Sequence, residues 1–416
     1  MWNSFLMNKY GAVVLAALLC LAAAFPLRAQ VSLSETSSGR NVFPLSTKTC
    51  AAIMYDATSE PSVVGTAVGL LASDIEKVTG RVPSVSGNGS VPASCRYAVI
   101  AGTLGHSSLI DALVRDRKID VSSISGDWER YAVRLVEAPL KGVRRALVVV
   151  GSDRRGTAYG LLSLSRAIGV SPWYWWMDAP VEHRNSIYLS VNAYDAATPS
   201  VKYRGIFIND EDWGLLRWAK RNFEKELGNI GPKTYEKVCE LLLRLNANML
   251  APAMHEASTA FYQIPQNKEV ADRYGIIITA SHCEPLLLNT ASEWQKDRYG
   301  DWNYNTNSAR IDSVLNARVV ETSPYENAYV IALRGLHDRA MSGGESLDSR
   351  KATVQRALLN QRKILSDVLG KDASEIPQFF TPYKEVLDVY NQGLELPDDV
   401  TIVWPDDNYG YMKRLS

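Results

Sequence analysis

The sequence lacks an excess of charge of either sign, because 45 Lys and Arg residues balance 45 Asp and Glu residues. A protein whose main partner is nucleic acid or an anionic membrane usually carries a basic surplus. Histidine is also scarce, with five residues, and no His pair has the close helical spacing of a zinc motif. The sequence therefore predicts no nucleic-acid partner, no metal site and no other cofactor.

Cysteine is nearly as scarce, with five residues, of which Cys20 lies inside an apolar run. The others are Cys50, Cys95, Cys239 and Cys283. Cys50 and Cys95 could pair in an oxidising compartment, but reduced buried thiols suit their spacing equally well. The cysteines thus leave the redox state open.

Long apolar runs are absent after residue 30. The one run, Gly11–Phe25, follows Lys9 and precedes the small-residue stretch Leu27–Ala29. It is short for a membrane span and has the length of a signal-peptide core, although a retained anchor is the alternative. We expect residues 1–29 to be removed from a periplasmic or secreted protein that makes no stable membrane insertion.

Aromatic residues, by contrast, are plentiful, with ten Trp and twenty Tyr. Such residues stack on sugars in carbohydrate-binding proteins, but they also fill large cores. Four of them are consecutive, Trp173–Trp176. We expect these four to pack between two domains.

The first half of the chain alternates strand and helix patterns and predicts a small N-terminal α/β domain over residues 31–195. The expected strands are Ala51–Asp56, Tyr97–Gly102, Tyr131–Glu137 and Arg145–Gly151, and the expected helices are Gly65–Gly80 and Gly156–Val170. The turn from Gly151 to Gly156 lacks the Lys-Ser/Thr of a P-loop and the third Gly of a dinucleotide fingerprint. It therefore predicts a plain tight turn.

The second half repeats strand, polar loop and helix, which is typical of parallel βα units. The expected strands are Tyr203–Ile208, Asn248–Leu250, Gly275–Thr279, Ala328–Leu333, Gln378–Thr381 and Thr401–Trp404, and the expected helices are Thr234–Leu245, Ala309–Glu321, Ser349–Leu369 and Tyr383–Gly393. A closed (β/α)8 TIM barrel needs eight strands. Residues 196–416 therefore predict a partial (β/α) barrel with about six strands.

Polar side chains follow every one of these strands, at the edge where barrel enzymes place their chemistry. They include Asn209 and Asp210 after the first strand, His255 and Glu256 after the second, His282, Cys283 and Glu284 after the third, Arg334, His337 and Asp338 after the fourth, Tyr383, Lys384 and Glu385 after the fifth, and Asp406, Asp407 and Asn408 after the sixth. Glycoside hydrolysis needs a protonated carboxyl beside the leaving oxygen and a second carboxylate that activates water or attacks carbon. The carboxylates could supply both, and an Arg is a natural partner for a substrate carboxylate.

Several stretches resemble known families. The segment Gly156–Glu182 is similar to the segment before the barrel in glycoside hydrolase families 67 and 115. Tyr203–Leu215, Leu245–His255, Ser281–Leu287 and Pro382–Tyr411 resemble family 115. The resemblance implies an inverting xylan α-glucuronidase that removes α-1,2-linked glucuronic acid or its 4-O-methyl ether from xylan or glucuronoxylan oligosaccharides. It also implies a family chain that continues beyond Ser416, and it leaves open whether full-length members oligomerise.

The resemblance assigns roles to individual residues. Glu385 is the expected general acid, in a setting where partial burial and neighbouring carboxylates would keep its carboxyl protonated. Asp210, Asp338 or Asp407 is expected to activate water. Arg334 is expected to hold the substrate's carboxylate. The remaining substrate contacts are expected from Asn209, His282, Tyr383, Asp406 and Asn408.

Two alternatives remain beside this reading. One is a family 67-like α-glucuronidase. The other is a non-catalytic carbohydrate-binding remnant, since a six-stranded barrel leaves open edges. A family 20-like hexosaminidase would need an Asp-Glu pair after the fourth strand, where this chain has Asp338 and Arg339.

Overall fold

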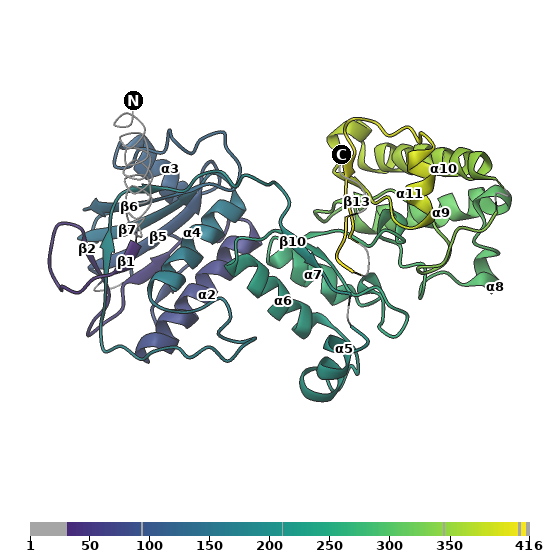
Figure 1. Ribbon diagram of the computed structural model, residues 1–416. Helices are drawn as coiled ribbons and strands as arrows, with labels where there is room; N and C mark the ends of the chain where they lie inside the picture. Colours follow the sequence, from purple (N-terminus) through teal and green to yellow (C-terminus); the bar gives the residue numbers. More distant parts are fainter. Residues whose placement is uncertain (1–30, 93–94, 210, 344–345, 407–408, 413–416) are drawn as a thin grey trace, which may run out of the picture.

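The computed structural model describes residues 31–92, 95–209, 211–343, 346–406 and 409–412, which form a mixed α/β fold with several sheets (Figure 1). The predicted signal peptide lies outside these residues. Within them, no helix combines the length and apolar character needed to cross a membrane. Cys50, Cys95, Cys239 and Cys283 are free thiols, so Cys50 and Cys95 do not pair here.

The first part of the chain builds a six-stranded sheet in the order β4-β3-β5-β7-β6-β9. The first four strands in this order are parallel, whereas β6 and β9 join antiparallel. The strands are β3 (Ala52–Met54), β4 (Val85–Ser86), β5 (Tyr97–Thr103), β6 (Tyr131–Glu137), β7 (Arg145–Gly151) and β9 (Tyr194–Asp195). A small antiparallel sheet, β1-β8-β2, stands beside it and consists of β1 (Val31–Leu33), β2 (Val42–Ser46) and β8 (Ile187–Val191).

Helices cover both faces of the six-stranded sheet. The helices α2 (Ser62–Thr79) and α4 (Arg154–Ala167) pack into one hydrophobic cluster, and α3 (Ser108–Arg115) packs into a separate one. Along each β-strand successive side chains point to opposite faces, so Val99 joins the first cluster and Ile100 the second. The sheet is thus the middle layer of a three-layer sandwich.

The turn before α4 is a tight structural turn. The Asp153 side chain accepts a hydrogen bond from Gly156 N at 2.8 Å and caps the helix. A Cβ atom at Gly156 would lie 2.0 Å from the carbonyl oxygen of Arg130, so only glycine fits. Because a carboxylate already occupies the helix N-terminus, the turn is not built as a phosphate loop.

The second part of the chain contains six short parallel strands that follow one another in chain order. They are β10 (Gly205–Phe207), β11 (Met249–Ala251), β12 (Ile277–Ile278), β13 (Tyr329–Val330), β14 (Gln378–Phe380) and β15 (Thr401–Ile402). Two parallel sheets, β10-β11-β12 and β13-β14-β15, are connected by a parallel bridge between Ile278 and Asn327. Five of these strands are shorter than the sequence patterns predicted, and β11 has the predicted length but begins one residue later. Some pairing continues past their ends, as in the bond from Val403 N to Phe380 O at 2.8 Å.

Helices separate these strands, as expected for βα units. The helices are α5 (Leu215–Trp218), α6 (Pro232–Arg244), α7 (Pro265–Arg273), α8 (Lys296–Tyr299), α9 (Tyr304–Thr322), α10 (Leu347–Leu369) and α11 (Glu385–Asn391). A π-helical turn, Ala219–Phe223, follows α5, and short 3-10 turns cover Phe261–Gln263, Pro285–Leu287 and Ala373–Glu375. The sequence patterns predicted α6, α9, α10 and α11 but missed α7, in which few residues are buried.

The row of six strands is strongly curved. The ring of Tyr203, just before β10, lies 5.3 Å from the ring of Phe379 on β14, centroid to centroid. In a flat sheet the first and fifth strands would stand roughly 19 Å apart at the usual strand spacing. The inner side chains gather accordingly into one cluster that contains Ile277, Val330 and Phe379.

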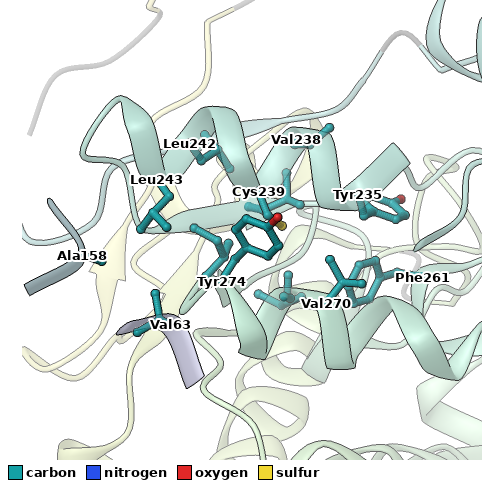
Figure 2. Close-up of a cluster of buried hydrophobic side chains, with 14 of the residues drawn as sticks. Val63, Ala158, Tyr235, Val238, Cys239, Leu242, Leu243, Phe261, Val270 and Tyr274 are labelled. Carbon is teal, nitrogen blue, oxygen red and sulfur yellow. The ribbon is translucent and has the colours of Figure 1, made fainter. Parts of the chain in front are cut away.

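The two parts of the chain pack through helices. Figure 2 shows Val63 of α2 and Ala158 of α4 facing the apolar side of α6, with α7 below α6 in this view. At the edge of this contact, Arg244 binds both carboxylate oxygens of Asp74 at 2.7 and 3.1 Å and also binds Glu240 at 2.9 Å. Burial alone would raise the pKa of Glu240, but Arg244 and Lys237 hold that pKa below its usual value. The interface is therefore both apolar and ion-paired.

The predicted aromatic stretch takes part in the same contact. The Tyr174 hydroxyl donates to Glu240 at 2.9 Å, and the Trp176 indole donates to the carbonyl of Lys237 at 3.1 Å. Trp175 packs edge-on against Trp218. These side chains connect the end of the first part to the helices of the second.

Candidate active site

A cavity of about 890 Å³ lies inside the curved row of strands. Residues of β10, β11, β13, β14 and β15 line it, together with the loop after β12. Its size is in the range of ligand pockets in enzymes. The polar part of its wall comes from the carboxyl ends of the parallel strands, where the sequence analysis placed the chemistry.

An ionic cluster centred on Arg334 lies beside this cavity. Arg334 donates from Nε to Glu385 Oε1 at 3.1 Å and from Nη2 to Glu385 Oε2 at 2.8 Å. It also forms an ion pair with Asp338, and Asp338 pairs in turn with Lys384. His282 Nε2 lies 2.8 Å from Asp338 Oδ1. Three strand ends thus contribute to one cluster, which is called the Arg334 cluster below.

The ion pairs of the cluster shift the pKa values of Asp338 and Arg334 so that both side chains stay charged. Burial alone would raise the pKa of Asp338, but His282, Lys384 and Arg334 hold that pKa well below its usual range. Burial would lower the pKa of Arg334, but Glu385 and Asp338 raise it above its usual value. Asp338 therefore stays ionised at any pH at which the protein works, and it is a weak base.

The surroundings of Glu385 and Arg334 differ from the sequence-based expectation. Glu385 was expected to face other carboxylates, but it faces the Arg334 guanidinium and accepts a further hydrogen bond from Met341 N at 3.2 Å. Arg334 was expected to hold a substrate carboxylate, but its side chain is 1% exposed and contacts two carboxylates of the protein. Periodicity in the sequence places both residues at strand ends but does not show which side chains meet there.

The other predicted substrate contacts are found in two places. His282, Tyr383, Asn209 and Asp406 line the cavity, and the rings of His282 and Tyr383 lie 4.7 Å apart. Asp210, Asp407 and Asn408 lie outside the described residues. Glu385 and Arg334 are not in the cavity wall itself but lie behind Asp338 and Tyr383, which are.

The sequence placed Lys384 at the end of the fifth strand but indicated no role for it. Its side chain is 47% exposed beside Asp338, and its ammonium lies over the Tyr383 ring at 5.2 Å. Its backbone has φ 50° and ψ −127°, a conformation that costs a non-glycine residue free energy and recurs at functional sites. The only signal in the sequence was its place between Tyr383 and Glu385.

Comparisons with known proteins agree on one family. The family model described as Glycosyl hydrolase family 115 matches residues 196–416. A solved structure titled as a family GH115 4-O-methyl-α-glucuronidase, BtGH115A, with specificity for decorated arabinogalactans, is 39% identical, with a TM-score of 0.80. The match covers 90% of this chain and 47% of that one, so this chain spans about half the length of that relative. No curated protein matches the chain.

More distant structures share the fold alone. A Flavobacterium johnsoniae chitobiase of family GH20 has a TM-score of 0.53 at 12% identity, and the match covers 92% of this chain and 55% of that one. A Streptomyces coelicolor GH20 β-N-acetylhexosaminidase has a TM-score of 0.50 at 11% identity, with 92% and 71% covered. At such identities the likeness concerns architecture and not chemistry.

Proposed function

Because the chain belongs to glycosyl hydrolase family 115, we propose that the protein hydrolyses α-1,2-linked glucuronosyl or 4-O-methylglucuronosyl groups on xylan, with inversion. The observation that carries the proposal is the Arg334 cluster, which gathers two carboxylates and two cationic side chains at the strand ends beside a cavity of sugar-binding size. Decorated arabinogalactan is the second candidate substrate, because the relative with 39% identity is described as specific for it.

Glu385 is the proposed general acid. A leaving sugar oxygen must be protonated as its bond breaks, and a carboxyl beside the cavity can supply that proton. Both carboxylate oxygens of Glu385 accept hydrogen bonds from Arg334, so this pair has to open before the carboxyl can reach a leaving sugar oxygen. Entry of a negatively charged substrate beside the cluster would compete for the cations and would have this effect.

Lys384 is the proposed first contact for the substrate's carboxylate. Its side chain is 47% exposed next to Asp338, which lines the cavity, whereas the Arg334 guanidinium is buried and already paired. A uronate that binds Lys384 would also draw it away from Asp338. Arg334 would then bind the substrate carboxylate only after the pair with Glu385 has opened.

Water activation is assigned to Asp210 or Asp407 rather than to Asp338. Asp338 contacts Arg334, Lys384 and His282, and its depressed pKa makes it a poor proton acceptor. We therefore give Asp338 the task of holding His282, Arg334 and Lys384 in place. In an inverting enzyme, the acid and base carboxyls stand about 6.5–9.5 Å apart.

The curved row of strands is proposed to be part of a (β/α)8 barrel, after a separate N-terminal domain that ends near residue 195. The contact between Tyr203 and Phe379 supports closure. So do the exposed apolar side chains Ile206 and Phe207 on β10 and Val403 just after β15, which further strands would cover. Export through a signal peptide at residues 1–29 stays a proposal.

The decisive experiment uses the whole protein with 4-O-methylglucuronoxylan. NMR should find free 4-O-methylglucuronic acid released first as the β-anomer. Glu385→Gln should lower kcat on the polysaccharide about 10²-fold or more, and it should lower it least on aryl glucuronides with good leaving groups. Unchanged turnover by this variant, or the α-anomer as first product, would refute the assignment.

The same experiment separates the alternatives. Glucuronate release from short xylo-oligosaccharides but not from the polymer would favour a family 67-like enzyme. Sugar binding without any release would favour a non-catalytic carbohydrate-binding protein.

A further inference from the structure

A second group of side chains, which contributes two histidines to the wall of the same cavity, lies next to the Arg334 cluster. His255 Nδ1 lies 2.7 Å from Asp212 Oδ2, and the rings of His255 and His337 meet edge to face with centroids 4.6 Å apart. Both histidines belong to the cavity wall. Since His337 directly precedes Asp338, the two groups are neighbours on one rim.

This group is held in place from behind. Glu211 is fully buried, and its Oε1 accepts hydrogen bonds from Met254 N at 2.9 Å and from His255 N at 2.5 Å. His337 donates its backbone N–H to Thr290 Oγ1 at 2.9 Å. His337 also has φ 56°, in the left-handed region that a non-glycine residue adopts at a cost. The loops thus fix both imidazoles toward the cavity.

The chemistry of the group fits a neutral partner with many hydroxyls. Burial first, and then the neighbouring His255, lower the pKa of His337, so its ring is uncharged near neutral pH. Uncharged imidazoles donate and accept single hydrogen bonds, as sugar hydroxyls require. Among the described residues, no three His, Cys, Asp or Glu side chains are placed to hold a metal ion.

Two polar atoms of the group, Asp212 Oδ1 and His337 Nε2, make no hydrogen bond to any described residue. His255 Nδ1 is already taken up by its 2.7 Å contact with Asp212 Oδ2. Buried polar atoms normally find partners, so this concentration is unusual for a wall with no ligand.

An exposed indole belongs to the residue that follows Asp212 in the chain. Trp213 follows Asp212 in the loop after β10 and is 85% exposed. The loop around it is ordered by bonds from Leu216 N to Glu211 O at 2.9 Å and from Trp218 N to Gly214 O at 3.0 Å. An exposed aromatic ring near groups that bind hydroxyls is suited to stack on the apolar face of a sugar ring.

We infer that Trp213, Asp212, His255 and His337 form a subsite for the neutral sugar chain that carries the glucuronosyl group. The inference rests on the proposed function and specifies where its substrate's main chain lies. The charged uronosyl group fits the Arg334 cluster, which leaves the neighbouring wall of the cavity for uncharged sugar rings. Trp213 stacks on one ring, and the imidazoles bind its hydroxyls.

The test is binding of an unsubstituted xylohexaose to the whole protein, measured by isothermal titration calorimetry. Trp213→Ala should weaken this binding about tenfold, since the loss of a stacking contact of about 1.4 kcal/mol corresponds to a factor of ten in affinity. Trp213→Tyr, which keeps a stacking ring, should restore most of it. Trp173→Ala is the matched control, because Trp173 is also exposed but lies in the segment before β8. It should bind as the wild type does.

Two further arms make the result specific. A β-1,3-galactohexaose tested in the same way shows whether the neutral chain is a xylan or a galactan. On decorated polysaccharide, Trp213→Ala should raise KM about tenfold with kcat little changed. On an aryl α-glucuronide, which lacks the chain, both constants should stay the same.

Failure of the inference can be told from failure of the proposed function. If neither neutral oligosaccharide binds, or if Trp213→Ala binds them as well as the wild type while glucuronate is still released, the subsite is refuted. If the oligosaccharides bind through Trp213 but no glucuronate is released, the subsite stands and the proposed hydrolysis fails. Thermal unfolding of each variant verifies that it is folded.

Discussion

Arg334 holds Glu385 through both carboxylate oxygens, at 3.1 and 2.8 Å, and the same guanidinium pairs with Asp338. The planar fork of arginine makes such a double contact possible, whereas lysine offers a single charged point. The pair therefore fixes the orientation of the Glu385 carboxylate and not only its charge.

Arg334→Lys should lower kcat for glucuronate release about 10²-fold, because a misoriented carboxyl delivers its proton poorly. The measurement is kcat on 4-O-methylglucuronoxylan, with thermal unfolding of the variant as the check that it is folded. A folded variant with wild-type kcat would show that Arg334 does not orient Glu385.

Lys384→Met should raise KM for charged substrates about tenfold, because it removes the exposed cation beside the cavity while keeping a side chain of similar length. Steady-state kinetics on an aryl α-glucuronide and on the corresponding neutral glucoside would measure the preference. Lys296→Met is a control, since this exposed lysine pairs with Asp301. A drop in kcat with KM unchanged would show that Lys384 works through Asp338 instead.

Glu284 should make stability depend on pH. It is buried, and this burial raises its pKa to about 8. Between pH 4.5 and 8 the folded protein keeps a proton on Glu284 that the unfolded chain releases. The contribution of this group to stability is thus complete below pH 4.5. It is lost as the pH rises from 4.5 to 8, by about 1.4 kcal/mol per pH unit, and no further loss occurs above 8.

Glu284→Gln removes this titration while keeping an oxygen that accepts from Ser281 N. The free energy of unfolding, measured in urea, should be similar to that of the wild type at pH 5 and higher than that of the wild type at pH 9. Glu256→Gln, at an exposed position, should change neither value. Equal destabilisation of the Glu284 variant at both pH values would contradict the buried, protonated state.

The strands and most long helices of this chain could be read from its sequence, because apolar periodicity reports burial. The run Ala328–Leu333, for example, was predicted as a strand and contains β13. Helix α7 was missed because only three of its residues, Asn267, Val270 and Ala271, are buried, which gives too weak a pattern. Most of the predicted strands in the second part were also too long, since apolar runs continue into loops that are buried without regular strand pairing.

The sequence could predict where the candidate site lies in the fold, but not which of its side chains contact one another. Strand ends indicated where Arg334, Asp338 and Glu385 lie, but ion pairing between them depends on distances across three strands. Sequence reasoning therefore gave Arg334 to the substrate, whereas its guanidinium is taken up by the protein's own carboxylates. The sequence assigned no role to Lys384, because its distinguishing property is a backbone conformation, and a single lysine in a sequence does not predict that conformation.

The contact between Tyr203 and Phe379 has a consequence for how the chain reaches its native state. It joins the segment before the first strand of the row to the fifth strand, so it is among the most non-local contacts of this part of the protein. Contacts of this kind form late in folding, because the entropy of closing a long loop is lost before the contact can stabilise the chain. During synthesis the first part of the chain can fold while the second is still emerging. The curved wall of the cavity, in contrast, cannot form until β14 has left the ribosome, and until then the inner side chains of β10 and β11 lack the partners that they have in the native fold.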